Sequence, residues 1–252
     1  MSSVRSRPSF AYTSHNTAQL IRGGGAYFTL LLSLIDKALH TIHLQVYIYD
    51  EDETGQEVAV ALMAAARRGV AVYLLVDGYA SQNLPAHFIS KLEQEGIHFR
   101  FFQPLLKSDH FYFGRRLHHK IAVIDARYSL VGGINISNKY NDGFDQPAWL
   151  DWALYTEGEI VPELVRVCLE LWTKSKRERK KLLWQTHPPV GQPQPACAIR
   201  LRRNDWVQKE RRSRIVIWAC LKKPGRIYTL CPAISYRACW CGRKWPAPPE
   251  EG

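Results

Sequence analysis

Apolar residues in the first part of the chain recur with two alternating periodicities, one helical and one of a strand. In residues 26–41 they recur at helical intervals, and in residues 42–49 they alternate with other residues at a period of two, as in a strand. The same helix–strand unit occurs twice more, with helices over 55–69 and 85–96 and strands over 70–78 and 97–102. Repeated units of this kind predict an α/β fold, with a mixed, largely parallel sheet flanked by helices on both faces.

Shorter strands are expected further along the chain. The pattern predicts them over 116–125, 128–134 and 149–158. One long helix is then predicted over 160–181, and its last turns carry a run of basic residues.

The composition and periodicity of the sequence change after this helix. A Pro-rich stretch indicates a linker, residues 215–223 favour a helix, and from Pro232 onward neither period persists. The predicted organisation is a domain over 16–182, a linker over 183–197, and over 198–252 the truncated or degenerate start of a second domain, ending in a short irregular extension.

Charge is distributed unevenly. The net charge is +11, but residues 1–172 carry 15 Lys and Arg against 18 Asp and Glu, whereas residues 173–252 carry 19 against 5. The basic character therefore belongs to the last third of the chain and says little about the part before it. A hydrophobic content of 46% is enough for a packed core.

Cysteine usage favours a reducing compartment, because five of the six cysteines lie after residue 190. The spacing of Cys220, Cys231, Cys239 and Cys241 matches no common zinc-ligand pattern. The first 20 residues show no signal peptide, and the longest apolar run is far shorter than the roughly 20 residues a spanning helix needs. We expect neither a metal nor a transmembrane helix.

The stretch RRLHHKIAVIDARYSLVGGINIS, residues 115–137, combines the side chains best suited to chemistry. Because strand side chains alternate, His118 and Lys120 are expected on one face and His119 on the other. Adjacent histidines diverge, and Lys120 would repel a cation, so a metal site at this pair is disfavoured.

Residues after this strand add groups that could surround a phosphate diester. Gly132 and Gly133 let a second backbone come close. Asn135 and Ser137 are two residues apart, so in an extended segment their side chains point to the same side and could donate hydrogen bonds to one ligand. Histidine is a competent phosphorus nucleophile near neutral pH, and a Lys with an Asn complements the phosphoryl oxygens. A histidine on an apolar strand is also often a core residue, so the residues alone leave both interpretations open.

The spacing His118-x-Lys120-x4-Asp125-x6-Gly132-Gly133-x-Asn135 resembles the HKD motif of the phospholipase D superfamily. The flanking sequence, from QVYIYDEDETG to WLDWALYTEG, is similar to the first half of bacterial cardiolipin synthases and related proteins. The resemblance implies a phospholipase D-like domain that forms a phosphohistidine intermediate without a cofactor.

The same resemblance assigns roles. His118 would be the nucleophile or general acid, Lys120 and Asn135 the phosphate clamp, and Asp125 a structural anchor for the motif. Asp151, on the strand predicted over 149–158, is our candidate for orienting a histidine in the site. A solvated or capping role for this carboxylate is an equal alternative.

The chain departs from the family in having one motif where full-length synthases have two, since no second His-x-Lys follows residue 137. One hypothesis is that its reading frame leaves the ancestral one near residues 215–232. The missing part of the site would then come from a second chain, either by homodimerisation or from a separately encoded half.

The sequence leaves three functions open. The first is a phosphatidyltransferase acting on an anionic, phosphatidylglycerol-like phospholipid, in the cytoplasm and peripheral at the inner membrane, with its basic helix end against the anionic surface. The second is a dimeric endonuclease or phosphodiesterase, which the acidic balance of the motif region makes less favourable. The third is an inactive remnant.

Overall fold

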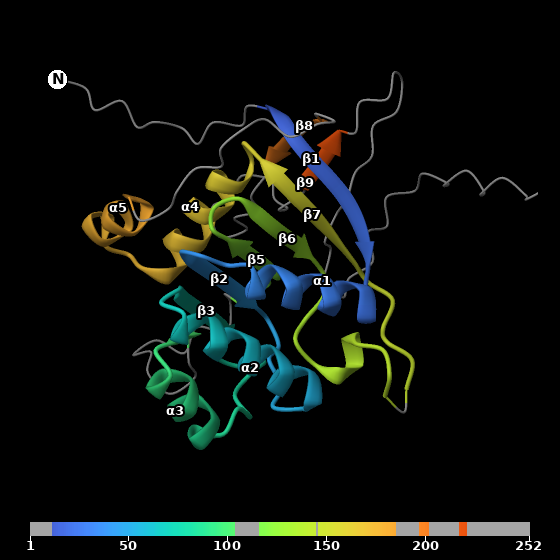
Figure 1. Ribbon diagram of the computed structural model, residues 1–252, viewed down its shortest axis with the longest axis vertical. Helices are drawn as coiled ribbons and strands as arrows, with labels where there is room; N and C mark the ends of the chain where they lie inside the picture. The colour runs from blue at the N-terminus through green and yellow to red at the C-terminus, as the bar shows by residue number, and fades with distance from the viewer. Residues whose placement is uncertain (1–11, 104–115, 145, 185–196, 202–216, 221–252) are drawn as a thin grey trace, which may run out of the picture.

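A computed structural model describes residues 12–103, 116–144, 146–184, 197–201 and 217–220, the last of these as a strand without its side chains. These residues form one sheet in the strand order β4-β3-β2-β5-β6-β7-β1-β8-β9 (Figure 1). The strands are β1 (Thr13–Arg22), β2 (Thr41–Val46), β3 (Ala71–Asp77), β4 (His98–Phe102), β5 (Ile121–Ile124), β6 (Tyr128–Gly132), β7 (Trp152–Gly158), β8 (Cys197–Leu201) and β9 (Ile217–Cys220).

The sheet is mixed, as expected, but its parallel part is smaller than the pattern suggested. Only β2, β3 and β4 run parallel, and every other neighbouring pair is antiparallel. The physical reason is the length of the connections. The turn between β5 and β6 is too short for a crossover, so these strands must pair as a hairpin.

Helices cover both faces of the sheet, which confirms the predicted α/β class. One face packs against α1 (Gly25–Asp36), α2 (Glu53–Arg67) and α3 (Ala86–Gln94), and the other against α4 (Val161–Trp172) and α5 (Lys176–Trp184). The short 3-10 helix η1 (Asn138–Tyr140) follows β6.

Strand alternation separates the two cores. Ala122 and Ile124 of β5 belong to the core beneath α1 and α2, whereas Ile121 and Val123 pack in the core beneath α4. The two faces of this strand therefore meet different helices, and the same alternation governs the residues that lead into it.

The single long helix predicted over 160–181 is wrong, because it is divided into α4 and α5. Thr173 has extended dihedral angles (φ −142, ψ 140), and its hydroxyl bonds to Glu178 Oε2 at 2.5 Å and accepts from Ser175 N at 3.1 Å. A Thr side chain that bonds the following turn competes with helix continuation and begins a new helix.

The C-terminal strands join the same sheet at the β1 edge. Residues 217–220 pair with β8, so the helix predicted over 215–223 is wrong, and strand pairing decides the conformation. The division into a domain, a linker and a second domain stays a prediction, because 185–196 and most residues after 201 lie outside the described part. Where the chain is described, no helix is long and apolar enough to cross a bilayer.

Candidate active site

His118 and Lys120 meet at one aromatic ring. The His118 ring stacks on the Tyr47 ring with centroids 4.9 Å apart and planes inclined by 24°. The Lys120 ammonium lies 5.1 Å from the centroid of the same ring, within range of a cation–π contact. Residues 116–120 lead into β5, and Lys120 O already accepts from Gly132 N at 3.1 Å, so strand pairing reaches this lysine.

His119 lies on the other side of the segment. Its Nδ1 is 3.2 Å from Gln45 Oε1, and Gln45 Nε2 donates to the backbone oxygen of Cys168 in α4 at 2.9 Å. His118 is exposed, whereas His119 is partly buried beneath α4. The two histidines therefore occupy different environments, and the ring of His118 contacts the same tyrosine as the Lys120 ammonium.

Lys120 is a buried cation with an altered pKa. Its side chain is 3% exposed, and its ammonium donates to the His118 backbone oxygen at 3.5 Å. Burial lowers the pKa of Lys120 to about 8, although the negative charges of Asp151 and Asp77 act in the opposite direction. The lysine is thus protonated at neutral pH and already partly desolvated for an anionic ligand.

The Asp151 carboxylate faces this lysine from the start of β7. It is half-buried, and burial raises its pKa while a hydrogen bond from Trp152 N at 2.7 Å and the charge of Lys120 lower it. A Cβ atom at Gly133 would lie 2.2 Å from both Asp151 oxygens, so only glycine leaves the space that this carboxylate occupies.

Gly132 makes room for the backbone of the neighbouring strand β7. A Cβ there would meet the Trp152 backbone oxygen at 2.2 Å and Ala153 Cα at 2.6 Å. The pair of glycines therefore brings the backbone of β7 close to β6, and Gly133 makes room for Asp151 beside Lys120.

Asn135 and Ser137 are buried residues in the segment that follows β6. Asn135 Oδ1 accepts from Ile48 N at 3.0 Å, and its Nδ2 donates to the Tyr140 hydroxyl at 2.8 Å. An amide nitrogen carries two hydrogens, so this one can still donate to a ligand. The Ser137 hydroxyl accepts from Lys139 N at 3.4 Å and caps η1.

Asp125 lies at the opposite end of β5 from His118. Its carboxylate accepts three backbone hydrogen bonds at 2.8 Å, from Leu39, His40 and Thr41. Its φ of 53° is in the left-handed region, which Asp tolerates better than most residues. This geometry ties the motif strand to the start of β2 and places the carboxylate away from the histidine.

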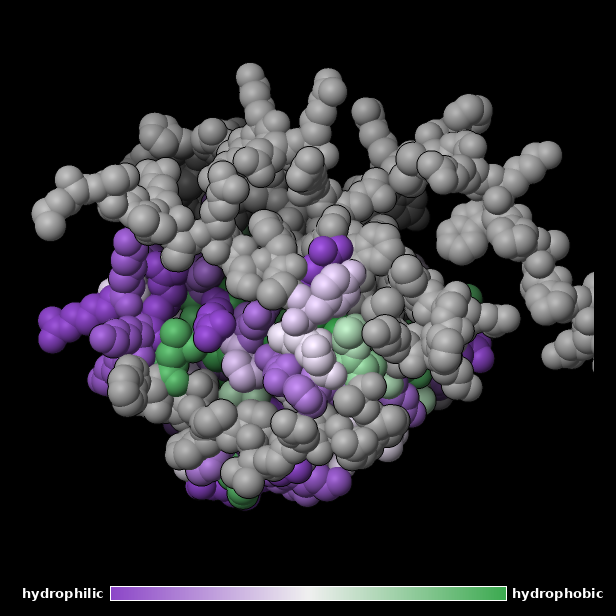
Figure 2. All heavy atoms as spheres, turned by 90° about the horizontal axis from the view of Figure 1, so that it is seen from above, coloured by the Kyte–Doolittle hydropathy of each residue, from purple (hydrophilic) through white to green (hydrophobic). Residues whose placement is uncertain are grey.

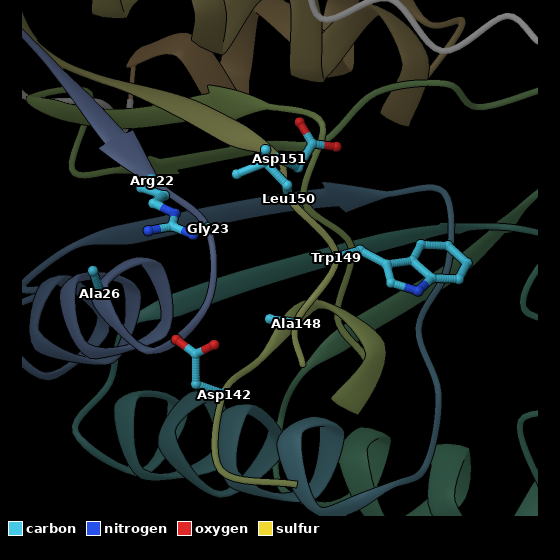
Figure 3. A pocket seen from close by; sticks show the side chains of 8 residues that line it. All are labelled: Arg22, Gly23, Ala26, Asp142, Ala148, Trp149, Leu150 and Asp151. Carbon is cyan, nitrogen blue, oxygen red and sulfur yellow. The ribbon is translucent and has the colours of Figure 1, made fainter. Parts of the chain in front are cut away.

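A hollow of about 280 Å³ opens on the far side of the segment that carries Asp151. Arg22 and Asp142 extend into it from opposite sides, while the Trp149 ring and the Asp151 carboxylate point away from them (Figure 3). Trp149 contacts Tyr140 edge-on at 5.4 Å, and Tyr140 in turn bonds Asn135, so this segment separates the hollow from the histidine site.

Comparison with known proteins shows the family to which this region belongs. Residues 31–146 match the family model described as "Cardiolipin synthase, PLD-like domain". The chain carries a phospholipase D-like domain. It is 34% identical to Cardiolipin synthase B of Escherichia coli strain K12 over 177 residues, which are 68% of this chain and 42% of that protein. It is also 34% identical to Cardiolipin synthase 1 of Bacillus anthracis over 162 residues, 62% of this chain and 31% of that protein.

A fold similar to that of this chain is also found among solved structures. A phosphatidylserine synthase of Haemophilus influenzae Rd KW20 superposes with a TM-score of 0.56 at 15% identity, over 76% of this chain and 51% of that one. The chain thus spans less than half the length of the curated cardiolipin synthases it matches, and these bacterial relatives confirm the resemblance expected from the motif.

Two residues of the phospholipase D-like site were not singled out from the sequence. Tyr47 follows the end of β2 and holds both His118 and Lys120, while Asp77 ends β3 and accepts from Leu117 N at 2.7 Å. Both stand just at or after the carboxyl end of a buried strand, in VYIYD and VDG. That position is a usable signal, because the ends of neighbouring parallel strands meet at one edge of a sheet.

Proposed function

We propose that the chain is a phosphatidyltransferase of the cardiolipin synthase type, with His118 as the residue that carries the phosphatidyl group. The observation that supports it most is the joint contact of His118 and Lys120 with Tyr47, with the Asp151 charge beside the lysine. An imidazole next to a buried ammonium suits attack on an anionic phosphodiester, because the cation stabilises the charge that develops on the phosphoryl oxygens.

The proposed reaction has two balanced steps. In the first, an imidazole nitrogen of His118 attacks phosphorus, a P–N bond forms, and the bond to the headgroup oxygen breaks as that alcohol takes a proton from a second histidine. In the second, an alcohol oxygen attacks phosphorus, the P–N bond breaks, and the hydroxyl proton returns to the second histidine. Water in place of the alcohol gives hydrolysis.

The second histidine is proposed to come from another chain, either a second copy or a complementing half. The motif supplies one histidine and one lysine, and the curated relatives are more than twice as long as the matched region. Asp151 is then the carboxylate that orients a histidine across the shared site, and Asn135 donates to a phosphoryl oxygen through the second hydrogen of its amide.

The approach of lipid is proposed to occur at the segment around Trp149, not at the basic helix. α5 carries five Lys and Arg against Glu178 and was expected to meet an anionic surface, and hydrophilic side chains gather on its side of the molecule (Figure 2). In Figure 1, however, α5 lies on the opposite side from the segment after η1, which leads to Asp151. A membrane held by α5 alone would leave the reaction centre away from the lipid.

The test compares the purified chain on phosphatidylglycerol vesicles and on plasmid DNA without added metal. We expect lipid products and intact plasmid, complete loss of activity in His118→Ala, and substantial activity in His119→Ala, since His119 contacts Gln45 beneath α4. Equal loss in the two variants would contradict the assignment of His118. Full turnover by a chain that sediments as a monomer would contradict the shared site, and cleaved plasmid with unchanged lipid would favour the nuclease.

A further inference from the structure

A second basic side chain, Arg116, lies beside the reaction centre. Its guanidinium carbon is 4.7 Å from the centroid of the Tyr79 ring, which is a cation–π contact. Its backbone oxygen accepts from His118 N at 3.0 Å, so the chain turns tightly between this arginine and the histidine. Within the part of the chain that the structure describes, no carboxylate or backbone oxygen bonds a guanidinium N–H of Arg116, so these groups can donate to a ligand.

The charge of Arg116 reaches the ring that His118 and Lys120 both contact. This ring is that of Tyr47, on which His118 stacks and near which the Lys120 ammonium lies. Burial and the Asp77 charge raise the pKa of the Tyr47 hydroxyl, whereas the Arg116 charge lowers it. The guanidinium is therefore close enough to interact electrostatically with the same tyrosine as the lysine does.

One buried carboxylate positions both members of the pair of Arg116 and Tyr79. Asp77 Oδ1 accepts from Tyr79 N at 3.0 Å, and Asp77 Oδ2 accepts from Leu117 N at 2.7 Å. Asp77 is fully buried, so water does not compete for these bonds. The tyrosine after β3 and the arginine before Leu117 are thus held by the same side chain, and the guanidinium is placed before a ligand binds.

The balance of charge around Lys120 shows why a second cation matters. The negative charges of Asp151 and Asp77 both act on this lysine. One positive and two negative groups leave a net charge of −1, which opposes the approach of an anionic phosphodiester. The Arg116 cation balances the remaining negative charge, so the four groups together no longer repel the anion.

We propose that Arg116 is a second phosphate-binding cation of the reaction centre, which donates to the phosphoryl oxygen that Lys120 does not bind. A phosphodiester has two non-bridging oxygens, and an ammonium acts on them as a point charge, whereas a guanidinium offers a planar fork of donors. The inference rests on the proposed phosphatidyl transfer and adds to it a residue, outside the His-x-Lys motif, that touches the substrate.

The test is a titration of the full chain by NMR with two small probes. Dimethyl phosphate is a phosphodiester monoanion, and trimethyl phosphate is a neutral ester of similar shape. We expect dimethyl phosphate to shift the backbone amides of Tyr79 and His118 and the side-chain Nε–H of Arg116, and we expect trimethyl phosphate to leave them in place. The affinity for dimethyl phosphate should be about tenfold weaker in Arg116→Gln, because a charge-assisted hydrogen bond is lost, and Arg116→Lys should recover most of it.

Arg127→Gln is the matched control. The Arg127 guanidinium carbon lies 4.9 Å from the centroid of the Tyr128 ring, so it repeats the arginine–tyrosine contact at the other end of β5. Its Nε donates to Glu157 Oε1 at 3.0 Å, far along the strand from the motif histidine. This substitution removes the same charge and the same kind of ring contact, and it should leave the affinity for dimethyl phosphate unchanged.

Three outcomes would overturn the proposal. One is an affinity for dimethyl phosphate that Arg116→Gln leaves unaltered. Another is binding of trimethyl phosphate that weakens equally in this variant, which would assign the effect to lost packing. The third needs no variant and is an Arg116 Nε–H signal that dimethyl phosphate does not move in the wild-type protein. Failure of the phosphatidyl transfer is seen separately, as absent lipid turnover by a wild-type chain whose binding of dimethyl phosphate still depends on Arg116.

Turnover gives an independent comparison. On short-chain phosphatidylglycerol, Arg116→Gln is expected to lower kcat/KM about tenfold, because the guanidinium no longer stabilises the charge on the phosphoryl oxygen. Arg127→Gln should keep the wild-type value. Wild-type turnover in Arg116→Gln would contradict the role of this arginine while leaving the phosphatidyl transfer in place.

Discussion

The altered pKa of Lys120 predicts an unusual limit to activity at high pH. Burial lowers the pKa of this lysine to about 8, and the ammonium is the group proposed to bind the phosphoryl oxygens. A group with this pKa is about 90% protonated at pH 7 and about 10% protonated at pH 9, so binding that needs the charge falls about tenfold over this interval. An ordinary lysine, with a pKa of about 10.4, would lose almost nothing.

The substitution that tests this origin is Lys120→Arg. A guanidinium stays charged throughout the range, and the Tyr47 ring offers it the same cation–π contact. We expect the decline in kcat/KM on short-chain phosphatidylglycerol above pH 8 to disappear in this variant. Asp151→Asn should move the midpoint below 8, because the Asp151 charge is one of those that raise the pKa of Lys120.

The control is Lys139→Arg, at an exposed lysine of η1 close to the same site. It should leave the pH profile of the wild type unchanged. A decline centred near pH 10 in the wild-type protein would refute the burial argument. So would a decline near pH 8 that Lys120→Arg leaves in place.

Three further predictions concern the supports of the site. Gly133→Ala places a Cβ 2.2 Å from both Asp151 oxygens, so turnover should fall at least about tenfold with little change in unfolding free energy, and unaltered turnover would contradict the placement of Asp151. Asp125→Asn should lower the free energy of unfolding in urea by about 3 kcal/mol while kcat of the folded protein is retained, because three backbone bonds are disturbed. His43 is fully buried, and burial lowers its pKa to about 4, so the unfolded chain binds the extra proton first and stability should fall by about 3 kcal/mol between pH 6.5 and 4. That fall should be absent in His43→Leu; an equal fall in the variant would assign it to other groups.

The side of the strand on which each histidine lies could be argued from alternation alone. Residues 116–120 lie outside β5, but the hydrogen bond from Gly132 N to Lys120 O extends the strand geometry to the residue before β5. Side-chain alternation therefore holds there as well. Tyr47 and Asp77 could not be placed from the pattern, since Tyr47 reaches His118 and Asp77 reaches the Leu117 backbone through tertiary contacts. Their position at strand ends marks them as candidates but does not show which residues they meet.

β1 shows the opposite case, a strand with no usable pattern. Within TSHNTAQLIR only Asn16 and Ile21 are buried, so apolar and polar residues do not alternate. The strand is held by seven pairings with β7 and by Asn16, whose side chain bonds Cys197 O and Ile160 N. Backbone pairing with partners 130 or more residues away in the chain determines this conformation, and no local sequence signal contains it.

Two carboxylates hold the motif strand at its two ends in the same way. Asp125, which follows β5, accepts hydrogen bonds from the backbone N–H groups of residues 39–41. Asp77, at the end of β3, accepts from those of Tyr79, Ala80 and Leu117, and Leu117 precedes β5. The segment from Leu117 to Asp125, which carries His118 and Lys120, is therefore tied to the start of β2 and the end of β3 by hydrogen bonds between carboxylates and backbone N–H groups. A group fixed in advance loses little conformational entropy when a ligand binds, which favours the proposed role of this segment in phosphatidyl transfer. In the proposed mechanism the two aspartates act by positioning this segment, and substitutions of His118 and Lys120 are expected to change activity without loss of the fold.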